Sequence, residues 1–147
     1  MKSIKFYLIA FTVMASAAFV GCSDDDDDTM AQVRVNGVVF DNGDDFNGDV
    51  DGDFMGTGGN ATRTFVWLNN LTTADYNADI TASAEGTFTI IVLDANGNIV
   101  LNRSLDGASE PDSISGVTES GISGVWSVTI TLGSFNGDGS FSLSEGN

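Results

Sequence analysis

Strict alternation of apolar and polar residues near the C-terminus constrains the fold more than any other feature of this chain. In residues 125–132, Trp126, Val128, Ile130 and Leu132 alternate with serine or threonine at every position between them. Successive side chains of a strand point to opposite faces of a sheet. The pattern therefore predicts an antiparallel strand with one buried face and one solvent-facing face.

Short apolar segments bounded by glycine and asparagine predict six further strands. They are residues 32–40, 61–71, 79–83, 86–94, 98–105 and 140–144. Asn36-Gly37 predicts a tight turn or bulge within the first of them, and residues 95–97 predict a hairpin between 86–94 and 98–105. No segment repeats its apolar residues at the helical period of 3.6. We therefore expect an all-β fold, an antiparallel β-sandwich of immunoglobulin-like or jelly-roll type.

The final two predicted strands carry a further resemblance. Residues 124–130 together with 135–143 resemble the end of pre-peptidase C-terminal domains and related jelly-roll binding modules. This resemblance favours a sandwich and leaves the ligand open.

The first 21 residues have the three parts of a secretory signal. Lys2 and Lys5 give a positive start, residues 6–20 carry no charge, and small residues gather before Cys22. The apolar run is shorter than the ~20 residues that a spanning helix needs. Cys22 is the chain's single cysteine, so it has no partner for an internal disulfide. We expect a signal peptide over residues 1–21.

The residues around Cys22 resemble two known export signals. Phe19-Val20-Gly21-Cys22 resembles the lipobox of bacterial lipoproteins, which implies cleavage before Cys22 and acylation of that residue. The following run of aspartates, 24–28, resembles the acidic signal that routes Bacteroidota lipoproteins to the outer face of the outer membrane. Like charges also repel and extend a chain, so the run can equally be a solvated spacer. We expect a lipid-anchored outer-membrane protein, with a tether over 22–31 and one domain over 32–147.

Charge limits the range of partners. The chain has 21 acidic and five basic residues, and only Arg34, Arg63 and Arg103 follow the signal. Such a negative field disfavours nucleic acid and attracts cations.

The acidic segment 41–53 is the strongest candidate for a metal site. Asn47, Asp49, Asp51, Gly52 and Asp53 match the start of a calcium loop, in which alternate oxygen ligands converge on one ion. Asp45 is a further candidate ligand in the same segment. Position twelve of the register is Gly58, not glutamate, and no helix is expected on either side, so an EF-hand is excluded.

Two readings of this segment remain open. A calcium site needs six to eight oxygens, which the segment supplies. The alternative is a flexible, solvated acidic loop. Phe46 and Phe54 argue against full disorder, because they could pin the segment to the core.

Two smaller clusters repeat the spacing of the calcium loop. Asp75-x-Asn77-x-Asp79 lacks the glycine, and Asp94-x-Asn96-x-Asn98 lies on a predicted hairpin turn. In the second cluster turn chemistry accounts for the residues, because such side chains cap their own backbone.

Three aromatic residues are candidates for a sugar-stacking site. Trp67 lies in a run that is apolar on both faces, Tyr76 lies in a polar segment, and Trp126 follows the alternation of the core. Trp67 and Tyr76 are therefore the candidate ligand-binding residues, and we expect Trp126 in the core.

Catalysis is not expected. The chain has no histidine, and its one cysteine is expected to be acylated, so the usual pairs of nucleophile and base are absent. We expect a surface binding module for a glycan or a protein, with calcium as a stabilising ion. The alternatives are an accessory subunit of an outer-membrane complex and a protein whose acidity is itself the function. Glycan binding predicts Trp67 or Tyr76 in a groove, and an assembly role predicts exposed valine or isoleucine on an edge strand.

Overall fold

The computed structural model describes residues 28–146, which form nine strands and no helix. The strands are β1 (Ala31–Val35), β2 (Val38–Val39), β3 (Asp45–Phe46), β4 (Val50–Asn69), β5 (Ala74–Ile80), β6 (Glu85–Leu93), β7 (Ile99–Asp106), β8 (Ser113–Val117) and β9 (Gly124–Glu145). This part of the chain accordingly offers no helical segment that could cross a membrane. The predicted signal peptide, Cys22 and most of the predicted tether lie outside the described residues.

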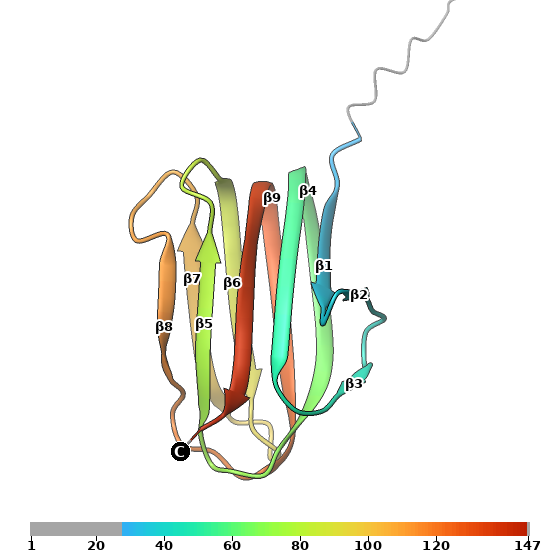
Figure 1. Cartoon of the computed structure of the whole chain (residues 1–147), viewed down its shortest axis with the longest axis vertical. Helices are drawn as coiled ribbons and strands as arrows, with labels where there is room; N and C mark the ends of the chain where they lie inside the picture. The colour runs from blue at the N-terminus through green and yellow to red at the C-terminus, as the bar shows by residue number, and fades with distance from the viewer. Residues whose placement is uncertain (1–27, 147) are drawn as a thin grey trace, which may run out of the picture.

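Two long strands, β4 and β9, form the centre of the fold. They pair in antiparallel orientation from Val50 opposite Leu143 to Asn69 opposite Gly124, with register shifts between Thr57 and Ala61. In Figure 1, the first half of β4 runs upward in one layer and its second half runs downward in the other. Strand β9 lies next to β4 in both layers. The pair therefore connects the two layers.

The other strands extend this central pair on both sides. In one layer, β1 pairs with the first half of β4 and β5 pairs with the second half of β9, while β2 and β8 lie outside them. In the other layer, β3 pairs in parallel with β4, β6 pairs with the first half of β9, and β7 lies outside β6. Strands β7 and β8 each have a single partner and end their layers on the same side (Figure 1).

The two layers face each other through aromatic side chains. Phe54 on the first half of β4 stacks on Phe88 of β6, with ring centroids 4.5 Å apart. Phe65 on the second half of β4 lies 6.5 Å from Phe141 on the second half of β9. All four rings are buried, and full burial of such a side chain contributes roughly 1.5–3 kcal/mol. Core packing, together with hydrogen bonding, holds the layers in place.

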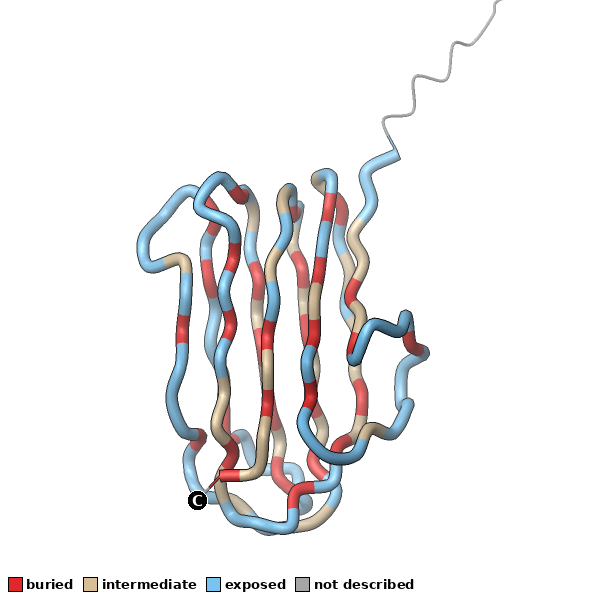
Figure 2. The backbone as a smooth tube through the Cα atoms, viewed as in Figure 1, coloured by how far each residue is buried: buried red, intermediate tan, exposed pale blue. Residues whose placement is uncertain are grey.

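The all-β class predicted from the sequence is confirmed. The strands belong to one hydrogen-bonded sheet that folds over on itself, because β4 and β9 continue through the bend. This pairing does not confirm the finer prediction of an immunoglobulin-like or jelly-roll sandwich. Figure 2 shows buried and exposed residues alternating along the strands, as the period of two requires.

Most of the predicted strands are present, with shifted bounds. The turn at Asn36-Gly37 joins β1 to β2, with φ of 50° and 77° at the two residues. The predicted hairpin is formed by β6 and β7. Segment 79–83 was wrongly placed, because the strand there is β5 and ends at Ile80. Strand β8 was not predicted.

The largest error concerns glycine-rich segments. Residues 133–139, which separate the predicted strands 125–132 and 140–144, lie inside β9. The strand bends there, and Gly86 of β6 lies so close that a methyl group on it would be 2.3 Å from the carbonyl oxygen of Ser134. Glycine at this point therefore permits close backbone packing at the bend.

Candidate functional site

The acidic segment is part of the folded structure. Asp45 lies on β3 opposite Val66, Asn47 and Asp49 are exposed between β3 and β4, and Asp51 and Asp53 lie on β4. Val50, Gly52 and Phe54 are buried between them. Apolar or small residues alternate with aspartates over 50–54, and this alternation indicates a strand. The match to the calcium-loop pattern led us to interpret the same residues as a loop.

The strand geometry separates the predicted calcium ligands. Asp51 and Asp53 project from the same face of β4, about 7 Å apart along the strand. Asp53 pairs with Arg34, whose nearest guanidinium nitrogen is 2.6 Å from Oδ1. Within residues 28–146 no three or more acidic, cysteine or histidine side chains lie close enough to hold a metal. Calcium binding at Asp45, Asn47, Asp49, Asp51 and Asp53 stays a prediction.

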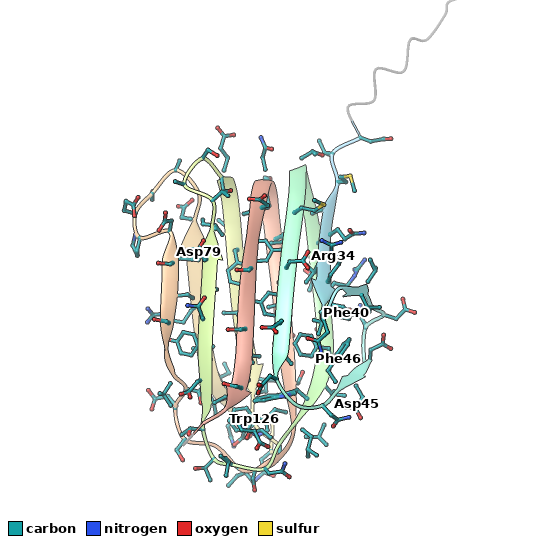
Figure 3. All side chains as sticks on the ribbon, in the orientation of Figure 1. Arg34, Phe40, Asp45, Phe46, Asp79 and Trp126 are labelled. Atoms are coloured by element: carbon teal, nitrogen blue, oxygen red, sulfur yellow. The ribbon has the colours of Figure 1, made fainter. Side chains whose placement is uncertain are left out.

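Two phenylalanines attach the acidic segment to the core. Phe40 directly precedes the segment and Phe46 lies within it, and their rings meet edge to face with centroids 5.6 Å apart. Both also contact Phe65 of β4, at 5.6 and 5.5 Å. Figure 3 shows the two rings side by side where this segment meets the sheet. The segment thus covers one open side of the folded sheet, between β1 and the second half of β4.

Trp67 is unavailable as a sugar-stacking residue. Its side chain is fully buried, and its indole N–H donates to the carbonyl oxygen of Gly48 at 2.7 Å. Its ring lies edge to face with Trp126, 6.1 Å away, at the lower end of the fold in Figure 3. The expectation that Trp126 belongs to the core is confirmed. A side chain without exposed surface cannot stack on a sugar, so Trp67 does not fit its candidate role.

Tyr76 lies in a groove at the other open side of the sheet. It is half-buried on β5, opposite Gly116 of β8 and Leu143 of β9. Gly116 leaves room for the ring, since a methyl group there would lie 3.2 Å from the phenol oxygen. A cavity of about 380 Å³ lies beside Tyr76, between β7 and β8. We call this cavity the edge groove; its main lining residues are Tyr76, Ile99, Leu101, Arg103, Val117 and Glu119.

Both apolar and charged residues line the edge groove. Ile99 and Val117 are about three-fifths exposed, at 61% and 59%, on the two edge strands. Glu119 donates its backbone N–H to the carbonyl oxygen of Val100 at 2.9 Å, which joins the end of β8 to β7. The groove is therefore bordered by two strand edges and closed where this hydrogen bond crosses between them.

Arg103 points toward the inside of the folded sheet. It is opposite Ile90 in the β6–β7 register, and directly opposite residues place their side chains on the same face. Ile90 is fully buried in the core. Because β7 is an edge strand, the long side chain of Arg103 reaches the edge groove instead of the core.

Asp94 has a structural role. Its carboxylate accepts backbone N–H bonds from Asn96, Asn98 and Ile122, at 2.8–2.9 Å. The Ile122 bond, with the bonds from Asn98 and Asn96, lowers the pKa of Asp94 from 3.8 to about 2, against the opposing effect of burial. The turn interpretation of the 94–98 cluster accounts for the bonds from Asn96 and Asn98, and the bond from Ile122 joins this turn to the segment before β9.

The Asp75 cluster lies on an open sheet face. Asp75, Asn77 and Asp79 alternate along β5 with buried residues, so they share the outer face of their layer. Asp79 is opposite Ser140, which in turn is opposite Asp53 of β4. The result is an acidic and hydroxyl-rich surface, and Asp79, Ser140 and Asp53 line a depression of about 360 Å³ in it.

No family description, curated protein or solved structure matches this chain. The geometry of the described residues is therefore the basis for any functional assignment. The edge groove is a concave site that contains Tyr76, a residue predicted from the sequence to bind a sugar.

Proposed function

We propose that this protein is a non-catalytic binding module, displayed at the cell surface by a lipid anchor, and that it binds a glycan in the edge groove. The observation that carries the proposal is the position of Tyr76, the predicted sugar-stacking residue, in this groove. An aromatic ring presents a flat face with little loss of conformational entropy. The groove's 380 Å³ falls within the range typical of small-ligand sites.

Binding is tested by calorimetry and glycan arrays with the purified protein and with Tyr76→Ala and Tyr76→Phe. We expect the alanine variant to lose binding and the phenylalanine variant, which keeps the ring, to retain it. Thermal melting of each variant separates a lost contact from a lost fold. Failure of every saccharide to bind, or unchanged binding by a folded Tyr76→Ala, would contradict the glycan proposal.

The anchor part of the proposal depends on Cys22. Acyl chains stabilise membrane attachment by about 0.8 kcal/mol for each buried methylene group, so several chains give a durable anchor. In a cell that exports the protein, Cys22→Ala should abolish metabolic labelling by a fatty-acid analogue and release the protein from the membrane fraction. Replacing aspartates 24–28 by alanine should leave labelling intact and remove the protein's sensitivity to external protease. Labelling that survives Cys22→Ala would contradict the anchor.

An apolar surface supports a second candidate function, an accessory subunit of an outer-membrane complex. Leu68 at the end of β4 is opposite Val125 at the start of β9, and both are exposed, at 38% and 56%. Exposed Ile99 and Ile122 belong to segments adjoining β6 and β9. This surface is at the end of the fold away from the point where residue 28 enters (Figure 1).

The accessory function predicts a partner protein that co-purifies after cross-linking. Val125→Asp places a charge in the apolar surface and should remove the partner, whereas Thr62→Asp, on an exposed site of β4, should not. Equal recovery of the partner with both variants would contradict this second function.

A further inference from the structure

We propose that the edge groove selects a sugar that carries a carboxylate, such as a uronic acid, and that Arg103 recognises the carboxylate. This inference rests on the proposed glycan-binding function and narrows its ligand class. Three observations support this inference: the orientation of Arg103, its lack of a side-chain partner within residues 28–146, and the presence of Tyr76 in the same groove.

The three arginines of the described part of the chain differ in their contacts. Arg34 pairs with Asp53, and Arg63 donates to the carbonyl oxygen of Thr62 at 3.1 Å. Arg103 makes neither an ion pair nor a side-chain hydrogen bond within residues 28–146. The chain has 21 acidic residues against five basic ones, so an arginine without a carboxylate partner is unexpected.

The groove offers the unpaired guanidinium to a ligand. A guanidinium has five N–H donors in a planar fork that matches the two oxygens of a carboxylate. Glu119 also lines the groove, but its carboxylate is not within 4.0 Å of Arg103. Tyr76 lines the same groove, so a sugar stacked on the ring could place a ring carboxylate at Arg103.

The overall negative charge of the protein does not exclude this ligand. At physiological ionic strength, exposed charges more than about 8 Å apart are largely screened from each other. Contacts inside the groove therefore decide selectivity, and there the cation is Arg103. The remote acids slow the approach of an anionic sugar more than they weaken the bound state.

A structural role for Arg103 makes a different prediction. An inward-pointing charge on an edge strand can prevent that edge from pairing with another molecule. On this explanation, loss of the charge would cause self-association and would leave sugar affinity unchanged.

The test compares short oligomers of glucuronate, galacturonate and mannuronate with neutral hexose oligomers of the same linkage. Calorimetry with the purified full chain should give tighter binding of at least one acidic oligomer than of its neutral counterpart. Arg103→Gln should reduce that affinity by about tenfold or more, the effect of losing a hydrogen bond to a charged group, and should leave neutral binding unchanged. Arg103→Lys should restore part of the affinity. Arg63→Gln removes the same charge outside the groove and should have no effect.

Each contrary outcome has a distinct meaning. Equal binding of acidic and neutral oligomers would overturn the carboxylate inference and leave glycan binding intact. An equal loss with Arg63→Gln and Arg103→Gln would also overturn it, because net charge would then explain the effect. Self-association of Arg103→Gln in light scattering, with unchanged affinity, would assign Arg103 to edge protection. Absence of binding by any saccharide would overturn the glycan function itself.

Discussion

The Oδ2 atom of Asp94 lies 2.9 Å from the backbone nitrogen of Ile122. This bond joins the β6–β7 turn to the segment that leads into β9. The other carboxylate oxygen of Asp94, Oδ1, caps the turn by accepting hydrogen bonds from the backbone N–H groups of Asn96 and Asn98. A single carboxylate therefore fixes two loops at the lower end of the fold.

Replacing Asp94 by Asn should destabilise the fold. The amide group keeps one acceptor oxygen, so at least one part-buried backbone N–H loses its partner, and an unpaired donor is costly. We expect a lower midpoint of thermal unfolding for Asp94→Asn. Asp106→Asn, at an exposed position of β7, is the matched control and should melt like the unmodified protein. Equal midpoints for all three proteins would contradict the role of Asp94.

The same carboxylate should make stability depend on acid. The folded-state pKa of Asp94 is lowered from 3.8 to about 2. The contribution of Asp94 to folding stability is therefore fully present above pH 3.8 and is lost as the pH falls toward about 2. The difference in unfolding free energy between the unmodified protein and Asp94→Asn should therefore shrink over that window. Urea unfolding at several pH values measures this difference. A constant difference from neutral pH to pH 2 would contradict the lowered pKa.

Two glycines form a matched pair for testing the bend. Gly86 and Gly97 have almost the same backbone conformation, with φ of 83° and 81°, but only Gly86 is crowded by the backbone of β9. Gly97→Ala should cost about 1–2 kcal/mol from conformation alone. Gly86→Ala adds a clash with the carbonyl oxygens of Gly133 and Ser134 and should cost clearly more in urea unfolding. Similar costs for both variants would show that the bend tolerates a methyl group.

Phe40 should anchor the acidic segment. It is buried, at 4% exposure, and removal of a buried phenyl ring costs about 3 kcal/mol or more. Phe40→Ala should also speed hydrogen exchange of residues 41–49. Val38→Ala, at a position 57% exposed, should change stability by less than about 0.5 kcal/mol. Unchanged exchange in Phe40→Ala would mean that the segment is held by its backbone bonds alone.

Calcium binding by the acidic segment has a sharp signature. Coordination by Asp49 and Asp51 predicts saturable uptake at one or two sites, a raised melting temperature, and loss of both in Asp49→Ala with Asp51→Ala. Magnesium serves as the control ion. Shallow, salt-sensitive uptake would contradict a calcium site, because separated strand carboxylates bind cations diffusely.

Local patterns in the sequence predicted local structure well. The alternation of Trp126, Val128 and Ile130 gave the correct buried face, and Asn36-Gly37 gave the correct turn. Tyr76 is half-buried on β5, whereas Trp126 is fully buried in the core. In each case the signal is carried by residues within a few positions of one another.

Features that depend on distant residues were missed. Aspartate has a low intrinsic preference for strands, so residues 50–54 resembled a loop. In the structure, β4 pairs with β1 and β9 at these residues, and this pairing makes the segment a strand. Glycines in 133–139 resembled a turn, but they serve close packing within β9. Arg103 was not predicted as a site residue, because its isolation from carboxylates depends on the fold.

The continuous pairing of β4 with β9 has a consequence for the order of folding. Strands β4, β5 and β6 all hydrogen-bond to β9, which begins only at Gly124. Such remote pairings raise contact order and slow folding to the millisecond-to-second range typical of all-β domains. Because the chain is synthesised from its N-terminus, β4, β5 and β6 are complete before β9 exists. These three strands therefore lack their shared pairing partner until β9 has been synthesised. The protein's own topology delays its folding until synthesis of β9 is almost finished.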